Sequence, residues 1–169
     1  MTDQLYEENL APSLLDRLTD DAPDEKQEAR AKRAFSVKQL KDSVHRDLVW
    51  LLNSGSLDDL TDFSETPHAE KSVINFGLPE LAGVTASTID TFGLNKKLKE
   101  IIKNFEPRII SNSVKVMVNK AKEKMSSNTL TIKIEGKLKA SPLPLHLLVK
   151  TELDLESGDM SITDFVAET

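Results

Sequence analysis

A glutamate and an arginine stand on either side of a proline in the segment "IIKNFEPRII", residues 101–110. The residue before a proline is disfavoured in helical geometry, so we expect a helix to end near Phe105, with Glu106 at its boundary. This explains Pro107 but not the two charges. Arg108 could cap the negative end of the helix and pair with Glu106, which is worth about 1 kcal/mol or less at an exposed site. The alternative is that the charged pair is directed at a partner.

The other residues that could do chemistry do not form a recognisable set. His45, His68 and His146 stand alone, without ligand partners at metal-binding spacing, so no metal site is expected. There is no P-loop, dinucleotide fingerprint or nucleophile elbow, and we expect no cofactor. The absence of cysteine excludes a disulfide framework, a thiolate metal site and a thiol nucleophile.

Carboxyl groups are abundant, and they leave one enzymatic possibility to weigh. A glycosidase needs two carboxyl groups facing a sugar, one of them kept protonated as a general acid. Glu106 is the best candidate, but the adjacent Arg108 favours the ionised carboxylate, which is the wrong form for that role. We therefore predict that the protein is not an enzyme and has no catalytic residues.

Composition restricts the class of protein further. The chain has 169 residues and a net charge of −6, which argues against a nucleic-acid partner. Its N-terminus, "MTDQLYEENL", is acidic and does not resemble a signal peptide, and the longest apolar run, "LVWLL", is too short to cross a membrane. These features predict a soluble, cytoplasmic protein without membrane insertion.

Residues 1–35 are predicted to form an N-terminal arm and a charged linker, and residues 36–169 a single domain. In the arm, "PSLLDRL" (12–18) can form one or two helical turns with Leu14, Leu15 and Leu18 on one side. This apolar cluster is equally compatible with docking on its own domain and with docking on another chain.

The domain is predicted to be α+β, with the arm and two main helices packed on one face of an antiparallel sheet formed by the C-terminal half. A first helix over 36–54 is indicated by Ser36 as N-cap and an apolar stripe; Trp50 projects from the opposite side, where we expect internal burial. A second helix begins at Ser87, which forms a weak capping box with Asp90. Beyond residue 113 the period changes to two, which is typical of strands.

The sheet offers a way to bind another chain. The sheet must have edges, and "TLTIKIEGKL" and "MSITDF" are regular, pleated segments that could accept an additional strand from another chain. Lysine and glutamate on these strands could equally protect the edge from pairing, which is the commoner situation.

Five segments in this order resemble one family: "PSLLDRL", "SVHRDLVWLLNS", "SVINFGLPELAG", "FEPRI" and "GKLKASPLPLHLLVKTELDLESGDMSI". The chain is similar, over about residues 12–165, to the TssE family of type VI secretion baseplate subunits, which belongs to the lysozyme-like baseplate wedge proteins of contractile phage tails. Glu106, Pro107 and Arg108 match the signature triplet of this family.

The resemblance implies a non-catalytic scaffold that links the baseplate wedge proteins TssF, TssG and TssK to the first ring of the sheath proteins TssB and TssC. It implies that the triplet, with the arm residues Leu14, Leu15 and Leu18, binds the wedge, and that the sheet edge receives sheath strands. Reversing the charge of Arg108 is then expected to leave the domain folded but to weaken wedge association. A peptidoglycan hydrolase, or the equivalent wedge subunit of a phage tail, is the alternative.

Overall fold

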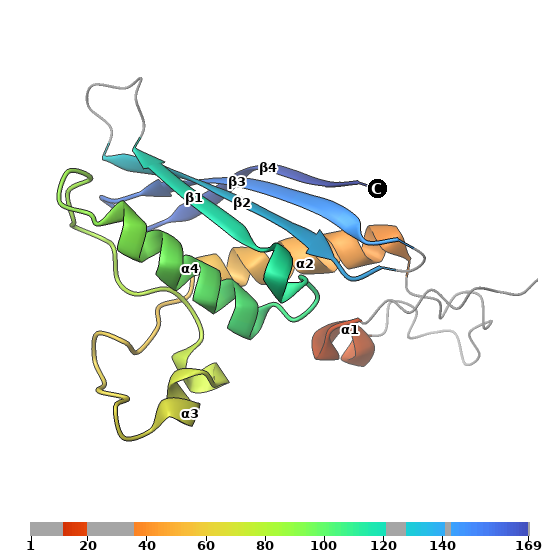
Figure 1. Ribbon diagram of the computed structural model, residues 1–169, viewed down its shortest axis with the longest axis horizontal. Helices are drawn as coiled ribbons and strands as arrows, with labels where there is room; N and C mark the ends of the chain where they lie inside the picture. The colour runs from red at the N-terminus through yellow and green to blue at the C-terminus, as the bar shows by residue number, and fades with distance from the viewer. Residues whose placement is uncertain (1–11, 20–35, 121–127, 141–142, 169) are drawn as a thin grey trace, which may run out of the picture.

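The structure, a computed structural model, describes residues 12–19, 36–120, 128–140 and 143–168. Helices lie on one face of a four-stranded sheet (Figure 1). The α-helices are α1 (Leu14–Leu18), α2 (Val37–Leu52), α3 (Pro67–Glu70) and α4 (Thr91–Phe105), and two 3-10 helices span Val73–Asn75 and Ser111–Ser113. The strands are β1 (Lys115–Lys120), β2 (Thr129–Leu138), β3 (Leu145–Asp154) and β4 (Met160–Glu168).

The two main helices begin at side-chain caps. The hydroxyl of Ser36 accepts from the N–H of Gln39, whose side chain accepts in return from the N–H of Ser36, so α2 starts where the sequence predicts. The prediction for α4 was wrong by one turn, because Asp90, not Ser87, is its N-cap. The reason is local: the chain before Asp90 makes a separate turn, in which the N–H of Thr88 donates to the carbonyl of Thr85.

The sheet is antiparallel throughout, with the strands in chain order from β1 to β4. Alternate residues of β2 and β3 point into the core, as their period of two predicts. Gly158, with φ of +81°, lies in the turn between β3 and β4, where its lack of a Cβ makes the left-handed conformation accessible. β4 carries one extra residue, because Ile162 aligns with Thr151 and Asp164 with Lys150.

One hydrophobic core lies between the sheet and the two long helices, and it confirms the predicted α+β class and the covering of one sheet face. The division into an arm of 1–35 and a domain of 36–169 stays a prediction. None of the helices in the described ranges is long and apolar enough to cross a membrane. The largest side chains below 2% exposure are Leu40, Leu48, Leu51, Leu98, Ile102, Ile109, Leu130, Ile132, Ile134, Leu138, Leu153 and Leu155.

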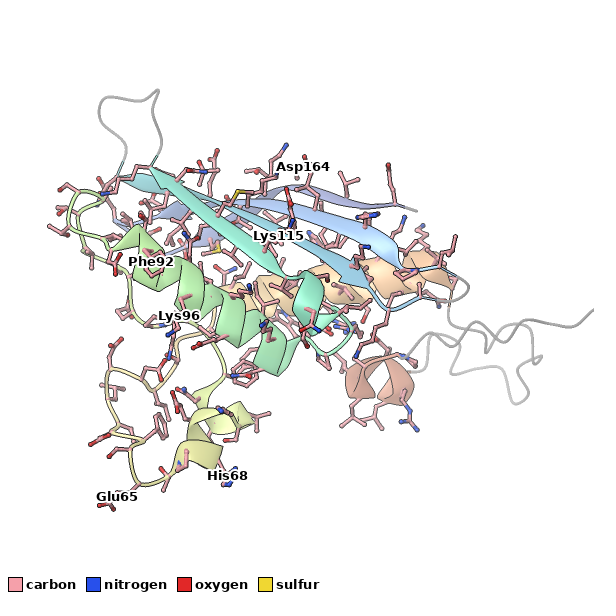
Figure 2. All side chains as sticks on the ribbon, viewed as in Figure 1. Glu65, His68, Phe92, Lys96, Lys115 and Asp164 are labelled. Carbon is pink, nitrogen blue, oxygen red and sulfur yellow. The ribbon has the colours of Figure 1, made fainter. Side chains whose placement is uncertain are left out.

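A lobe formed by residues 56–76 projects away from the sheet and carries α3 (Figure 1). The buried Asn75 ties it together, since its amide donates to the carboxylate of Asp58 and to the carbonyl of Glu70 and accepts from the N–H of Leu57. Figure 2 shows His68 at the tip of this lobe, exposed to solvent.

Candidate functional site

Glu106 and Arg108 form a buried ion pair at the end of α4. Glu106 is the C-cap of this helix, as Pro107 requires, and is 2% exposed, while Arg108 is 7% exposed. The guanidinium binds both carboxylate oxygens, with Nε–Oε1 at 2.7 Å and Nη2–Oε2 at 2.5 Å. This bidentate geometry is the strongest form of the arginine–carboxylate interaction.

Arg108 also reaches across to α2. Its Nη1 donates to the hydroxyl of Ser43 at 2.6 Å, and its Nη2 donates to the carboxylate of Asp47 at 2.6 Å. Burial alone would lower the pKa of Arg108, but the hydrogen bonds and charges of Glu106 and Asp47 raise it above its ordinary value. The arginine therefore stays charged and joins α2 to the end of α4.

The arm joins the same cluster through Asp16. This carboxylate accepts from the hydroxyl of Ser43 at 2.5 Å and from Nη1 of Arg46 at 2.8 Å, and it lies 3.9 Å from Nη1 of Arg108. Ser13 adds two more hydrogen bonds, because Ser13 and Asp16 form the capping box of α1. We call six of these seven residues the corner cluster, leaving out Ser13: Asp16, Ser43, Arg46, Asp47, Glu106 and Arg108.

The cluster corrects the interpretation of Glu106 and Arg108 as an exposed pair worth about 1 kcal/mol or less. Both side chains are inside the protein, where removing one partner leaves an uncompensated buried charge. The expectation that a charge reversal at Arg108 leaves the domain folded stays a prediction, and the burial of Arg108 weighs against it, because the new carboxylate would face Glu106 and Asp47. Pro107 alone of the triplet is exposed.

The described part of the arm, residues 12–19, docks on its own domain, but not through its leucines. Leu14, Leu15 and Leu18 are 70%, 41% and 75% exposed, and α1 has no buried residue. Asp16, on the opposite side, makes the contacts to the domain. The apolar side of α1 therefore faces away from the corner cluster.

Two aromatic side chains of α2 lie near this site, Trp50 and His45. Trp50 was expected to be buried inside the domain, but it is 51% exposed, with the guanidinium of Arg46 5.3 Å from the centre of its ring. Trp50 lies on the polar side of α2, where the side chain of Arg46, and not the hydrophobic core, packs on its ring. His45 is half-buried and packs edge-on against Phe165 of β4, as a boundary residue of α2 would.

Sequence reasoning missed four members of the cluster, although one signal was present. Ser43, Arg46 and Asp47 stand at i, i+3 and i+4 on a predicted helix, which places them on one face. Ser13 and Asp16 have the spacing of a capping box. Nothing in the sequence indicated that these two groups meet, since about 30 residues separate Asp16 from Arg46.

The edges of the sheet are β1 and β4, so "TLTIKIEGKL" (β2) was wrongly expected as an edge strand, because β2 pairs on both sides. Each edge strand is bound at one point by an asparagine from a helix. The amide of Asn53 makes two hydrogen bonds with the main chain of Met160 on β4, and Asn95 accepts from the N–H of Val118 on β1. These side chains occupy main-chain groups that another strand would use.

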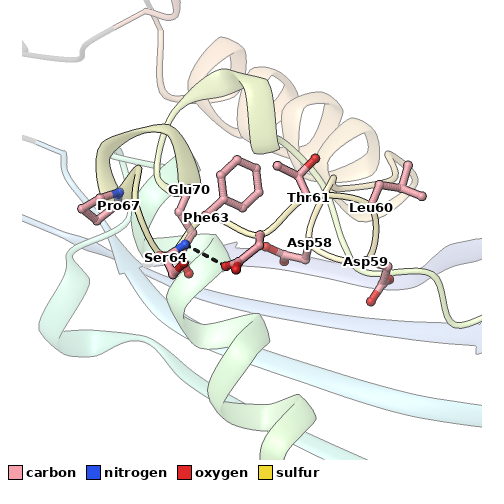
Figure 3. A pocket seen from close by; sticks show the side chains of 9 residues that line it. Asp58, Asp59, Leu60, Thr61, Phe63, Ser64, Pro67 and Glu70 are labelled. Atoms are coloured by element: carbon pink, nitrogen blue, oxygen red, sulfur yellow. Dashed lines mark hydrogen bonds between the residues drawn. The ribbon is translucent and has the colours of Figure 1, made fainter.

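A hollow of about 690 Å³ in the lobe is lined by carboxylates, with Leu60 and Phe63 beside them (Figure 3). Burial raises the pKa of Asp58, but Lys97 and Asn75 lower it below its ordinary value, and hydrogen bonds from Ser64 lower the pKa of Asp62. A general acid requires the opposite shift. Asp58 is paired with Lys97, and neither of the two carboxyl groups has the raised pKa of a general acid.

The comparisons with known proteins gave one match. The family model GPW_gp25, described as baseplate wedge protein gp25, matches residues 38–143, which include α2, α4, β1, β2 and five of the six residues of the corner cluster. No curated protein and no solved structure matches the chain.

Proposed function

Because the chain belongs to the gp25 family of baseplate wedge proteins, we propose that it is a non-catalytic structural subunit in the baseplate of a type VI secretion machine. A structural baseplate role in phage tail-like machinery follows from the family. The match over residues 38–143 is the observation that carries the proposal, and the resemblance of the five sequence segments to the TssE family supports the secretion machine. In this role the subunit is cytoplasmic, in a baseplate docked to the inner face of the cell envelope.

At one end, the subunit binds the wedge formed by TssF, TssG and TssK. The surface we propose consists of the exposed Pro107 and the leucine side of the arm, Leu14, Leu15 and Leu18. Glu106 and Arg108 support this surface from inside. Exposed leucines on a short helix are an apolar patch that association with a partner would remove from water.

At the other end, an edge of the sheet receives a strand from the first ring of TssB and TssC and so sets the start of the sheath. We propose β4 beyond Met160 as this edge. Met160 itself is excluded because its main-chain N–H and C=O groups already form hydrogen bonds with the amide of Asn53. A hollow of about 460 Å³ lies between α2 and residues 165–168 of β4 and provides space beside the strand.

Wedge binding is tested by changing Leu14 and Leu18 to serine and measuring association with purified TssF and TssG. Both leucines are exposed, so the fold should be unaffected, and we expect the affinity to fall by about tenfold or more, since a buried leucine contributes about 1.5–3 kcal/mol. The matched control is Leu60→Ser, which removes an equally exposed leucine from the lobe. Failure of the unchanged chain to bind these subunits would contradict the proposal.

Strand addition is tested by hydrogen–deuterium exchange of the full chain with and without TssB and TssC. Amides of β4 beyond Met160 should become protected, because an added strand accepts their hydrogen bonds. Protection of β1 instead would move the receiving edge to the other side of the sheet. Absence of protection at both edges would refute strand addition.

The alternative of a peptidoglycan hydrolase makes a separate prediction, namely muramidase activity that one carboxyl substitution abolishes. The lowered pKa values of Asp58 and Asp62 in the acidic hollow weigh against it. The alternative of a phage-tail wedge subunit shares the family and predicts binding to tail proteins in place of TssF and TssG.

A further inference from the structure

The arm depends on polar contacts for its position. Its helix, α1, has five residues, and helices of this length are unstable alone in water. No residue of α1 is buried, so packing of apolar side chains does not hold it in place. What remains among the described residues is the capping box, the contacts of Asp16 with α2 and the corner, and a hydrogen bond from Nη2 of Arg46 to the hydroxyl of Ser13 at 3.3 Å.

Those contacts come from side chains that converge on one carboxylate. Ser43 and Arg46 of α2 bind its two oxygens directly, and Arg108 stands behind Ser43 at 3.9 Å from the carboxylate. Ser43 is buried and bridges the two charges, because its hydroxyl accepts from Arg108 and donates to Asp16. The position of Asp16 is thus linked to Glu106, which fixes Arg108.

The electrostatics agree with this geometry. Burial raises the pKa of Asp16, but the hydrogen bonds from Ser43, Ser13 and Arg46 outweigh it and lower the pKa well below the ordinary value. The charged groups that face Asp16 are Arg46 and Arg108, and behind them lie Asp47 and Glu106. The carboxylate is therefore held in its ionised form by the hydrogen bonds from Ser43, Ser13 and Arg46, and the guanidinium of Arg108 lies 3.9 Å away.

We propose that Ser43, Arg46 and Arg108 form a clamp for the carboxylate of Asp16, and that this clamp fixes residues 12–19 in the position in which the arm meets the wedge. The inference rests on the proposed function for its wedge partner. It assigns Ser43 and Arg46 as positioning residues and gives Arg108 an effect on wedge binding that is relayed through the arm. Such docking is electrostatic and weakens as salt screens the charges.

The test uses the full chain with Asp16→Asn, which keeps the size of the side chain and removes its charge. The first readout is amide exchange of Arg17 and Thr19, whose N–H groups donate to Ser13 and Leu15 only while α1 is formed. We expect their protection to fall by about tenfold or more, as for a helix released into water. The second readout is the affinity for purified TssF and TssG, which should fall several-fold in a domain that remains folded.

Asp42→Asn is the matched control. Asp42 is exposed on α2, the helix that carries Ser43 and Arg46, and the change removes the same charge. It should alter neither readout. A second variant, Arg46→Gln, tests the clamp from the domain side and should release the arm in the same way.

Each outcome decides the inference. If Asp16→Asn retains the protection of Arg17 and Thr19, the clamp does not hold the arm, and if protection is lost without a loss of affinity, the arm does not relay the effect. Both results overturn the inference while wedge binding by the unchanged chain stands. If the unchanged chain does not bind TssF and TssG, the proposed function fails. The part of the inference that concerns wedge binding then fails with it.

Discussion

The corner cluster and the ion pair Lys150–Asp164 contain the same kinds of charged group in opposite settings. Lys150 and Asp164 face each other across β3 and β4 at 3.0 Å, with side chains 46% and 39% exposed. The guanidinium of Arg108 and the carboxylate of Glu106 are 8% and 2% exposed, and Ser43 and Asp47 provide further hydrogen bonds. Burial, not charge, therefore decides which of the two pairs the fold depends on.

The difference also explains where each pair lies. Lys150 and Asp164 lie on two neighbouring strands, β3 and β4, that main-chain hydrogen bonds already hold together. The corner cluster joins three segments, α1, α2 and the end of α4, that no sheet connects. A buried polar network can fix such a junction in one geometry, provided that every member is satisfied, and no buried side-chain polar atom in the described residues lacks a partner.

The largest effect is expected for Arg108→Ala. It leaves the carboxylate of Glu106 buried without its cation, so the free energy of unfolding should fall by about 3–5 kcal/mol. Urea denaturation measures this change, and Lys150→Ala serves as the exposed control with an expected loss of about 1 kcal/mol or less. Equal losses in the two variants would remove the distinction between the pairs.

A smaller effect is expected for Ser43→Ala. The change removes the hydroxyl that links Arg108 to Asp16, and leaving these buried groups without a partner costs about 1–3 kcal/mol. Denaturation is again the measurement, with Ser161→Ala on the exposed side of β4 as the control. A stability unchanged from that of the native chain would show that water replaces the hydroxyl.

The pH dependence of the arm sharpens the comparison without a mutation. The pKa of Asp16 is lower in the folded chain than its ordinary value of about 3.9. The contribution of its carboxylate to the docking of the arm is therefore fully present above a pH of about 3.9 and is lost as the pH falls through the lower pKa of the folded chain. A carbon-13 titration of the Asp16 carboxyl should therefore have its midpoint well below 3.9. A midpoint near the ordinary value would mean that Asp16 is free in solution.

The smallest effect is expected for the coupling between Lys150 and Asp164. A double-mutant cycle with alanine at both positions should give about 0.2–1 kcal/mol, and 1 M salt should reduce it further. A coupling as large as that between Arg108 and Glu106 would contradict the role given to burial.

The sheet and the long helices could be predicted from the sequence because their signals are local. The alternation of Ile132 and Ile134 indicates a strand, and Ser36 indicates the start of α2. The end of α4 at Glu106 also follows from one local rule, the restriction that Pro107 places on its predecessor. Wherever a local rule acts without competition, the prediction is confirmed.

The site could be predicted only in part, because its contacts join residues that are far apart in the sequence. The sequence indicated that Glu106 and Arg108 matter, but their burial depends on Ser43 and Asp47, which lie more than 60 residues away. The exposure of Trp50 likewise depends on Arg46, which reaches toward the arm. The asparagines that bind the sheet edges gave no signal, since Asn53 meets Met160 across 107 residues.

The account as a whole is tested most directly by hydrogen–deuterium exchange of the unmodified full chain, alone and with purified TssF and TssG. We predict new protection in residues 12–19 and around Pro107, with no change in the lobe of residues 56–76. Protection confined to the lobe, or no protection anywhere, would contradict the claim that the arm and the corner form the surface that meets the wedge.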